Sequence, residues 1–109
     1  MAFDETLAER VREALAGRAD VGERRMFGGI AFMVAGNMAV GIVGDDLMVR
    51  LDPEDAERAL AGPHVRPMDF TGRPAKNMVF VDAEGTAADE NLAAWVDAGA
   101  DYASSLPPK

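Results

Sequence analysis

The sequence of 109 residues contains no cysteine and a single histidine. Disulfide bonds, thiolate metal sites and cysteine nucleophiles are therefore excluded, and the composition fits a reducing compartment. No run approaches the roughly 18 consecutive apolar residues that a bilayer span needs. The first ten residues carry acids and lack a basic segment followed by an apolar block, so they do not resemble a signal peptide. We expect a cytoplasmic protein without a membrane span.

Positive charge is also scarce. Nineteen acidic residues against eleven basic ones give a net charge of -8. Such a charge opposes the phosphate attraction that supplies most of the affinity of a nucleic-acid binder, so direct nucleic-acid binding is disfavoured. Between residues 84 and 108 there are five acids and no base. The C-terminal segment is expected to present an acidic face.

No group of residues with catalytic chemistry is visible. His64 stands alone in a predicted loop, and one imidazole without cysteines does not predict a zinc site. Ser104 and Ser105 have no nearby histidine and no nucleophile elbow. Asp45 and Asp46 lack the spacing of a calcium loop and suit a hairpin turn, and no phosphate-binding glycine motif occurs. We therefore predict no enzyme, no metal and no cofactor.

Strand-forming residues concentrate between residues 24 and 51. The segments 35–37 and 44–46 contain glycine with asparagine or aspartate, which is typical of hairpin turns. They divide the stretch into three predicted antiparallel strands, near 25–34, 38–43 and 47–51. The segment 17–23 contains two glycines and no periodicity, and is predicted to be a connector.

Helical patterns flank this sheet. A helix is predicted over 4–16 with Asp4 as its cap, and Asp52-Pro53 begins a short second helix. Thr86 with Asp89 resembles a capping box for a last helix. Its apolar stripe comprises Leu92, Trp95, Val96, Gly99, Tyr102 or Ala103, and Leu106. This helix carries the only Trp and the only Tyr and is expected to supply the largest share of helix-on-sheet burial, so Trp95→Ala should cost about 3–5 kcal/mol.

Two shorter strands are predicted over 65–70 and 77–82, the first at a sheet edge because Pro67 lacks an N–H donor. The whole order is helix, three strands, helix, two strands, helix. This predicts a single domain over residues 1–109, with an α+β, two-layer αβββαββα fold and an antiparallel sheet. Such a sheet exposes its edges unless something covers them, so a homodimer through a sheet edge or face is one expectation.

The start of the strand-rich stretch carries the candidate site. Arg24 and Arg25 precede Phe27 and the pair Gly28-Gly29, which in a strand indicates a bulge, a bend or a close approach. Three more bases, Arg66, Arg73 and Lys76, surround the second predicted hairpin. If these bases converge, they form a site for an anion or an acidic partner. The alternative is that they are solvated strand-edge charges that deter aggregation.

Methionines are numerous for this length. Six of the seven lie within or beside predicted strands, at positions 26, 33, 38, 48, 68 and 78. Core filling is the commoner reason for such methionines, and an adaptable binding surface is the alternative. Exposure of several of them together would favour the binding surface.

Four blocks of the sequence resemble the N-terminal domain of the TfoX/Sxy family. They are ERRMFGGIAFMVAGNMAVGI, DDLMVRL, RPMDFTGRP and the tail LAAWVDAGADYASSLPPK, which together span nearly the whole chain. The resemblance implies a secretion-chaperone-like αβββαββα fold. The family takes its name from two-domain regulators of natural competence, and the resemblance leads us to expect that this chain corresponds to the first domain, standing alone.

Two functions follow as expectations. The first is a non-enzymatic interaction or regulatory module of the TfoX N-terminal type, which binds a protein partner and is linked to competence or transcription. The second is a small-molecule or anion-binding domain that uses the side of Arg24, Arg25, Arg73 and Lys76. A partner module should expose a sheet edge or an apolar patch, whereas a ligand domain should show a concave pocket lined by bases.

Overall fold

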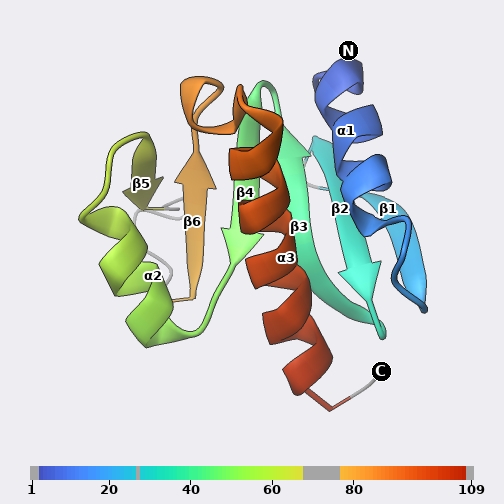
Figure 1. The fold of residues 1–109 in the computed structure, drawn as a ribbon. Coiled ribbons are helices and arrows are strands. Elements are labelled where there is room, and N and C mark those ends of the chain that lie inside the picture. Colours follow the sequence, from blue (N-terminus) through green and yellow to red (C-terminus); the bar gives the residue numbers. More distant parts are fainter. Residues whose placement is uncertain (1–2, 27, 68–76, 108–109) are drawn as a thin grey trace.

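Six strands pair into one antiparallel sheet, and the helices lie on one of its faces (Figure 1). The computed structural model describes residues 3–26, 28–67 and 77–107. The strand order is β1-β2-β3-β4-β6-β5. The strands are β1 (Val21–Met26), β2 (Gly29–Val34), β3 (Asn37–Val43), β4 (Asp46–Arg50), β5 (Val65–Pro67) and β6 (Met78–Val81). The helices are α1 (Glu5–Leu15), α2 (Pro53–Leu60) and α3 (Asp89–Ser105), with a 3₁₀ turn, η1 (Glu84–Thr86).

The predicted α+β class with an antiparallel sheet is confirmed, and the structure adds one strand to the predicted order. The segment predicted as one strand over 25–34 is two strands joined by a tight turn, and the predicted connector supplies the first half of β1. Gly28 has a φ of +75°, a left-handed conformation that glycine adopts without strain, and Met26 pairs with Gly29 across the turn. β1 escaped prediction because all six of its residues are exposed and show no apolar alternation.

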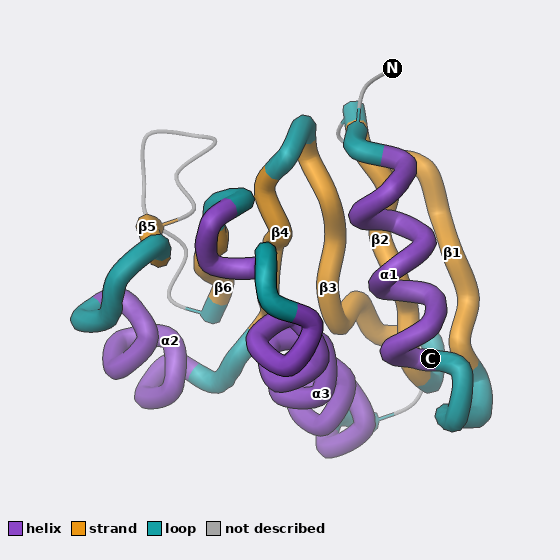
Figure 2. The backbone as a smooth tube through the Cα atoms, turned by 45° about the horizontal axis from the view of Figure 1, so that its top comes forward, coloured by secondary structure: helices purple, strands orange, loops and turns teal. Residues whose placement is uncertain are grey.

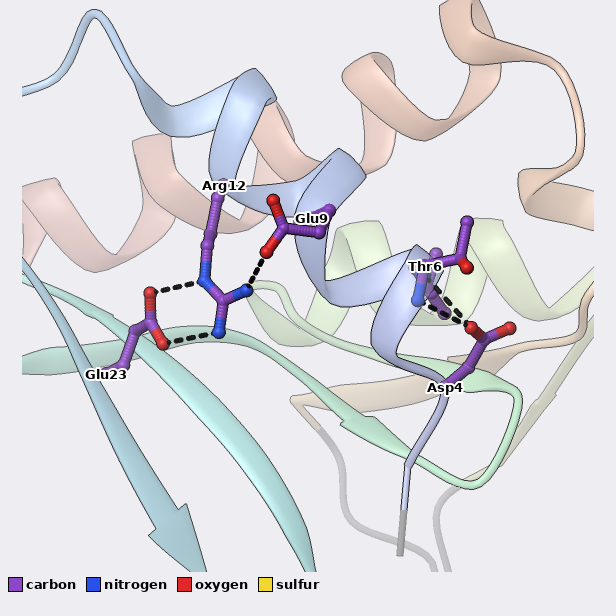
Figure 3. Close-up of polar contacts among 6 residues, drawn as sticks. Asp4, Thr6, Glu9, Arg12 and Glu23 are labelled. Carbon is purple, nitrogen blue, oxygen red and sulfur yellow. Dashed lines mark hydrogen bonds and ion pairs between the residues drawn. The ribbon is translucent and has the colours of Figure 1, made fainter. Parts of the chain in front are cut away.

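Local capping signals were reliable for the first two helices. The Asp4 carboxylate accepts hydrogen bonds from the backbone N–H groups of Thr6 and Leu7, at 2.9 and 3.2 Å (Figure 3). Asp52 accepts from the N–H of Asp55 at 2.9 Å, and Pro53 occupies the first turn of α2. Both predicted starts are confirmed.

The predicted capping box of the third helix is wrong. α3 begins after Ala88, which makes no side-chain cap. Thr86 lies inside η1, where its hydroxyl donates to the Ala83 carbonyl at 3.3 Å and is buried. The 3₁₀ turn uses the residue that a capping box would need.

The main core lies between the sheet and the helices. One row of paired residues crosses four strands, and all its members are fully buried: Phe32, Val40, Val49 and Val79. α3 crosses this layer closely, because a Cβ at Gly99 would lie 2.5 Å from the Ala39 carbonyl oxygen. Figure 2 shows α1, α2 and α3 on the same side of the sheet.

Trp95 does not carry the main burial of α3. It is half-buried at the rim of the core, whereas Leu92, Val96, Ala100 and Ala103 are buried. The close approach at Gly99 favours small side chains between helix and sheet, so the indole lies beside the contact. The expected cost of 3–5 kcal/mol for Trp95→Ala assumed full burial, and it should be smaller for a side chain at the rim.

The face of the sheet without helices carries the strand methionines. Met33, Met48 and Met78 alternate with the core residues of their strands. A register shift in the pairing of β2 with β3 places Met38 opposite Met33, and Met26 lies on the same face of β1 as Arg24, so the five described methionines share this face. Met48 and Met78 are buried with Phe80, Met33 and Met38 are half-buried, and Met26 is 40% exposed. Core filling is therefore confirmed for Met48 and Met78 but not for Met26. Met68 lies outside the described residues.

Candidate functional site

The candidate site is the outer edge of β1, where the backbone of the strand has a neighbour on one side only. No described element lies beyond β1 in the sheet order (Figures 1 and 2). The Ala35 N–H donates to the Asp20 carbonyl at 3.0 Å, which makes Asp20 and Ala35 a hydrogen-bonded pair. Antiparallel ladders alternate, so Gly22, Arg24 and Met26 direct their backbone groups to β2.

The backbone groups of the alternate residues therefore point away from the sheet. They belong to Val21, Glu23 and Arg25. An edge of this kind is a template for a further strand, because three N–H groups and three carbonyls face outward in register. The exposure of all six residues of β1 is consistent with this.

The side chains of the same three residues lie on the helix side of the sheet, where α1 holds one of them. The Arg12 guanidinium donates two hydrogen bonds to the Glu23 carboxylate, at 2.7 and 2.9 Å, and a third to Glu9 at 2.5 Å (Figure 3). The paired hydrogen bonds from Arg12 hold the pKa of Glu23 below its ordinary value. The Arg25 guanidinium lies over the ring of Phe3, 5.4 Å from its centroid. β1 is thus anchored to α1 although its edge is open.

The other face of β1 carries a notch. Gly22 lies opposite Met33, and a Cβ built on Gly22 would meet no atom within 4 Å. The resulting depression has a volume of about 570 Å³ and is lined by Gly22, Arg24, Met33 and Gly36 among others. Arg24 is exposed and makes no ion pair within the described part of the chain. This notch joins an apolar floor to the charge of Arg24, and its lining also includes the acidic residues Asp20 and Glu23.

The predicted site residues are only partly brought together. Arg24 and Arg25 are neighbours along β1, but the pleat of the strand places their side chains on opposite faces of the sheet. Gly28 forms the hairpin turn and Gly29 opens β2. Phe27, Arg73 and Lys76 lie outside the described residues, so their part in the site stays a prediction.

Arg66 does not belong with the bases of β1. It lies on β5 at the opposite edge of the sheet, about 24 Å away by five strand spacings of about 4.8 Å. There it donates to Asp46 at 2.5 Å and covers the Phe80 ring, 4.7 Å from its centroid. The convergence of Arg66 with Arg24 and Arg25 was therefore a wrong expectation, because the two segments occupy opposite ends of the strand order.

A second polar group was missed by the sequence reasoning. His64 has a φ of +66°, and its Nδ1 lies 3.2 Å from a carboxylate oxygen of Asp82. The Gly85 N–H and, secondly, His64 lower the pKa of Asp82. A depression of about 370 Å³ beside them is also lined by Trp95. The predicted second hairpin brings the start of its first strand near the end of its second, which places His64 close to Asp82. Its predicted strands would have paired Val65 with Asp82, whereas Val65 pairs with Val81.

No metal site accompanies these groups in the described segments. Nowhere in residues 3–26, 28–67 and 77–107 do three or more histidine or carboxylate side chains gather in a way that could hold a metal ion. Among the same residues, no helix is long and apolar enough to cross a membrane.

Two comparisons with known proteins agree on the fold. The family model described as the TfoX N-terminal domain matches residues 13–103, which include every strand of the sheet. A crystal structure of Deinococcus radiodurans protein DR2400, which carries a domain described as DUF419, superimposes with a TM-score of 0.65. The two sequences are 20% identical, and the match covers 84% of this chain and 74% of that protein.

At this identity, the structural match shows a shared fold and nothing further. A search of curated proteins found no match. The family model covers most of the chain, including both strands of the β1–β2 hairpin and most of α3. The chain therefore belongs to the TfoX N-terminal domain family.

Proposed function

We propose that this chain is a non-enzymatic interaction module of the TfoX N-terminal type, which acts through protein contacts in the regulation of competence or transcription. The observation that carries the proposal is the open edge of β1. It presents six exposed residues and three outward N–H groups. Membership of the TfoX N-terminal domain family supports the regulatory setting.

The position of the bases favours a protein partner over a small anion. A bound phosphate is usually held by several donors that converge on it. Arg24 and Arg25 diverge to opposite faces, and Arg25 is already stacked on Phe3. An extended polypeptide can contact both faces at once, since its own side chains alternate in the same way.

Two substitutions at one position test the role of the edge. Glu23→Ala removes the carboxylate that Arg12 holds and keeps the outward N–H, whereas Glu23→Pro removes both. Affinity capture from the native cell extract should retain the same protein on the wild type and on Glu23→Ala, and lose it on Glu23→Pro. Identical capture by all three proteins, or enrichment of small molecules alone, would contradict the proposed function.

A further inference from the structure

We infer that β1 receives an extended, acidic segment of a partner protein as a seventh strand, added antiparallel to β1. The inference rests on the proposed function and specifies the partner and its mode of binding. The backbone supplies the first argument. Val21, Glu23 and Arg25 offer a repeating set of donors and acceptors that an extended peptide satisfies residue by residue.

Charge indicates which peptide fits. The chain as a whole carries a net charge of -8, but β1 contains two arginines and one glutamate. Arg12 already pairs with that glutamate through two hydrogen bonds. Asp20 adds an exposed carboxylate just before the strand, at the end of the edge beside the notch. The Arg24–Arg25 end of the edge is therefore positive on an acidic protein, and it is complementary to an acidic segment.

The notch adds a position for an apolar side chain. A residue opposite Gly22 on the added strand would lie over the open space above Met33. Val21 is 37% exposed and offers an apolar neighbour on the other face. Read antiparallel to β1, the favoured segment has two acidic residues opposite Arg25 and Arg24, a polar residue opposite Glu23, and two apolar residues opposite Gly22 and Val21.

A second copy of this chain fits the edge less well. Two registers pair most of β1 with itself about a two-fold axis. One places Glu23 opposite its own copy. The other places Arg24 opposite its own copy, although it also sets Glu23 opposite Arg25 on both sides of the axis. Like charges directly opposite each other in a ladder are unfavourable, and the net charge of each copy adds to the repulsion.

The test uses a capped synthetic peptide with the sequence TEETVVT, and the reversed peptide TVVTEET as its control of equal composition and charge. Titration with the whole chain should show binding of the first peptide at least about tenfold tighter than that of the second. Arg24→Glu should weaken binding of the first peptide by at least about tenfold, since it replaces an attraction with a repulsion.

Methylation of single backbone amides in the forward peptide tests whether the peptide pairs with β1 as a strand. The N–H of the central threonine would face β1, so its methylation should lower affinity by at least about tenfold, because the facing carbonyl loses its donor. Methylation of the second glutamate, whose N–H would face away, should change affinity less than threefold. Equal effects of the two modifications would exclude strand addition.

Two further outcomes overturn the inference while leaving the proposed function open to its own test. Equal affinity for the forward and reversed peptides would mean attraction by charge without strand pairing. A dimer in sedimentation that Glu23→Pro dissolves and Glu23→Ala preserves would identify a second copy as the occupant. A third outcome is that the forward peptide does not bind, while Glu23→Pro still abolishes capture of the protein from extract and Glu23→Ala does not. This would reject an acidic segment as the occupant of the edge and would leave the proposed interaction module standing.

Discussion

The two edges of the sheet end in different ways. β1 is six residues long, contains no proline and directs three N–H groups outward. β5 has three residues, and the Asp82 N–H bond to the His64 carbonyl at 2.9 Å fixes its alternation, so that Val65 and Pro67 face outward. Pro67 has no N–H to offer, and Arg66 is engaged with Asp46 and Phe80. Within its described residues, β5 is blunted as edge strands usually are, whereas β1 is left open.

This difference separates two uses of arginine at a sheet edge. Arg66 lies across its own sheet and covers an apolar ring, so its charge serves the fold. Arg24 projects from an exposed strand beside an open notch and makes no ion pair within the described residues. The same residue type at both edges therefore has different consequences, which substitutions can separate.

The largest expected effect distinguishes the inward and outward amides of β1. Arg24→Pro removes an N–H that bonds to β2 and should lower the free energy of unfolding by about 2–3 kcal/mol. Glu23→Pro removes an outward N–H and should cost less than about 1 kcal/mol relative to Glu23→Ala. Urea unfolding of the four proteins measures both, and equal losses at the two positions would mean that the amide of Glu23 is also bonded.

The next effect compares the two arginines. Arg66→Ala should lower the free energy of unfolding by about 1–2 kcal/mol, because it removes an ion pair and the cation–π contact with Phe80. Arg24→Ala should change it by no more than about 0.5 kcal/mol. Thermal and urea melts in parallel provide the measurement. A larger loss at Arg24 than at Arg66 would reverse the assignment of their roles.

Substitution of Gly22 is expected to raise the free energy of unfolding, whereas the substitutions described above lower it or leave it nearly unchanged. Its backbone is not left-handed and a Cβ there meets nothing, so Gly22→Val should stabilise the fold by about 0.5–1 kcal/mol. The same change fills the notch and should weaken binding of the forward peptide. Urea unfolding of Gly22→Val and its titration with the forward peptide are measured on the same protein preparation. Destabilisation by more than about 1 kcal/mol would show that the space beside Gly22 is not free.

The smallest expected effect is the change in the free energy of unfolding with pH that arises from Glu23. The pKa of Glu23 is lowered in the folded chain, so its pairing with Arg12 stabilises fully above the ordinary glutamate pKa of 4.5 and is lost as pH falls through the lower folded value. Because the side chain is 39% exposed, the contribution at neutral pH should be about 0.5 kcal/mol or less. The difference in unfolding free energy between wild type and Glu23→Gln should shrink on acidification, and a difference that grows would contradict the pairing.

Sequence reasoning succeeded where a feature depends on neighbouring residues. The caps at Asp4 and Asp52 need only the following turn, and both occur as predicted. The shared core face of Leu47 and Val49 in β4 follows from alternation. In β3 the register shift overrides alternation and places Met38 on the face opposite Val40 and Ile42. The caps and the alternation in β4 account for the correct fold class.

It failed where the outcome depends on partners distant in sequence. β1 has no buried face, so no periodicity marks it, and its existence depends on pairing with β2. The burial of Trp95 depends on how closely α3 approaches Ala39. The separation of Arg66 from Arg24 depends on the strand order, which places β5 outside β6. The divergence of Arg24 and Arg25, in contrast, was available from the pleat alone.

Amide hydrogen exchange along β1, followed residue by residue by NMR, tests the central claim most directly. In the free protein, the N–H groups of Val21, Glu23 and Arg25 should exchange rapidly and those of Gly22, Arg24 and Met26 slowly. Addition of the forward peptide should slow the first set and leave β5 unchanged. Protection of Val21, Glu23 and Arg25 in the free monomer, or no change in them when the peptide is bound, would contradict an open edge that accepts a strand.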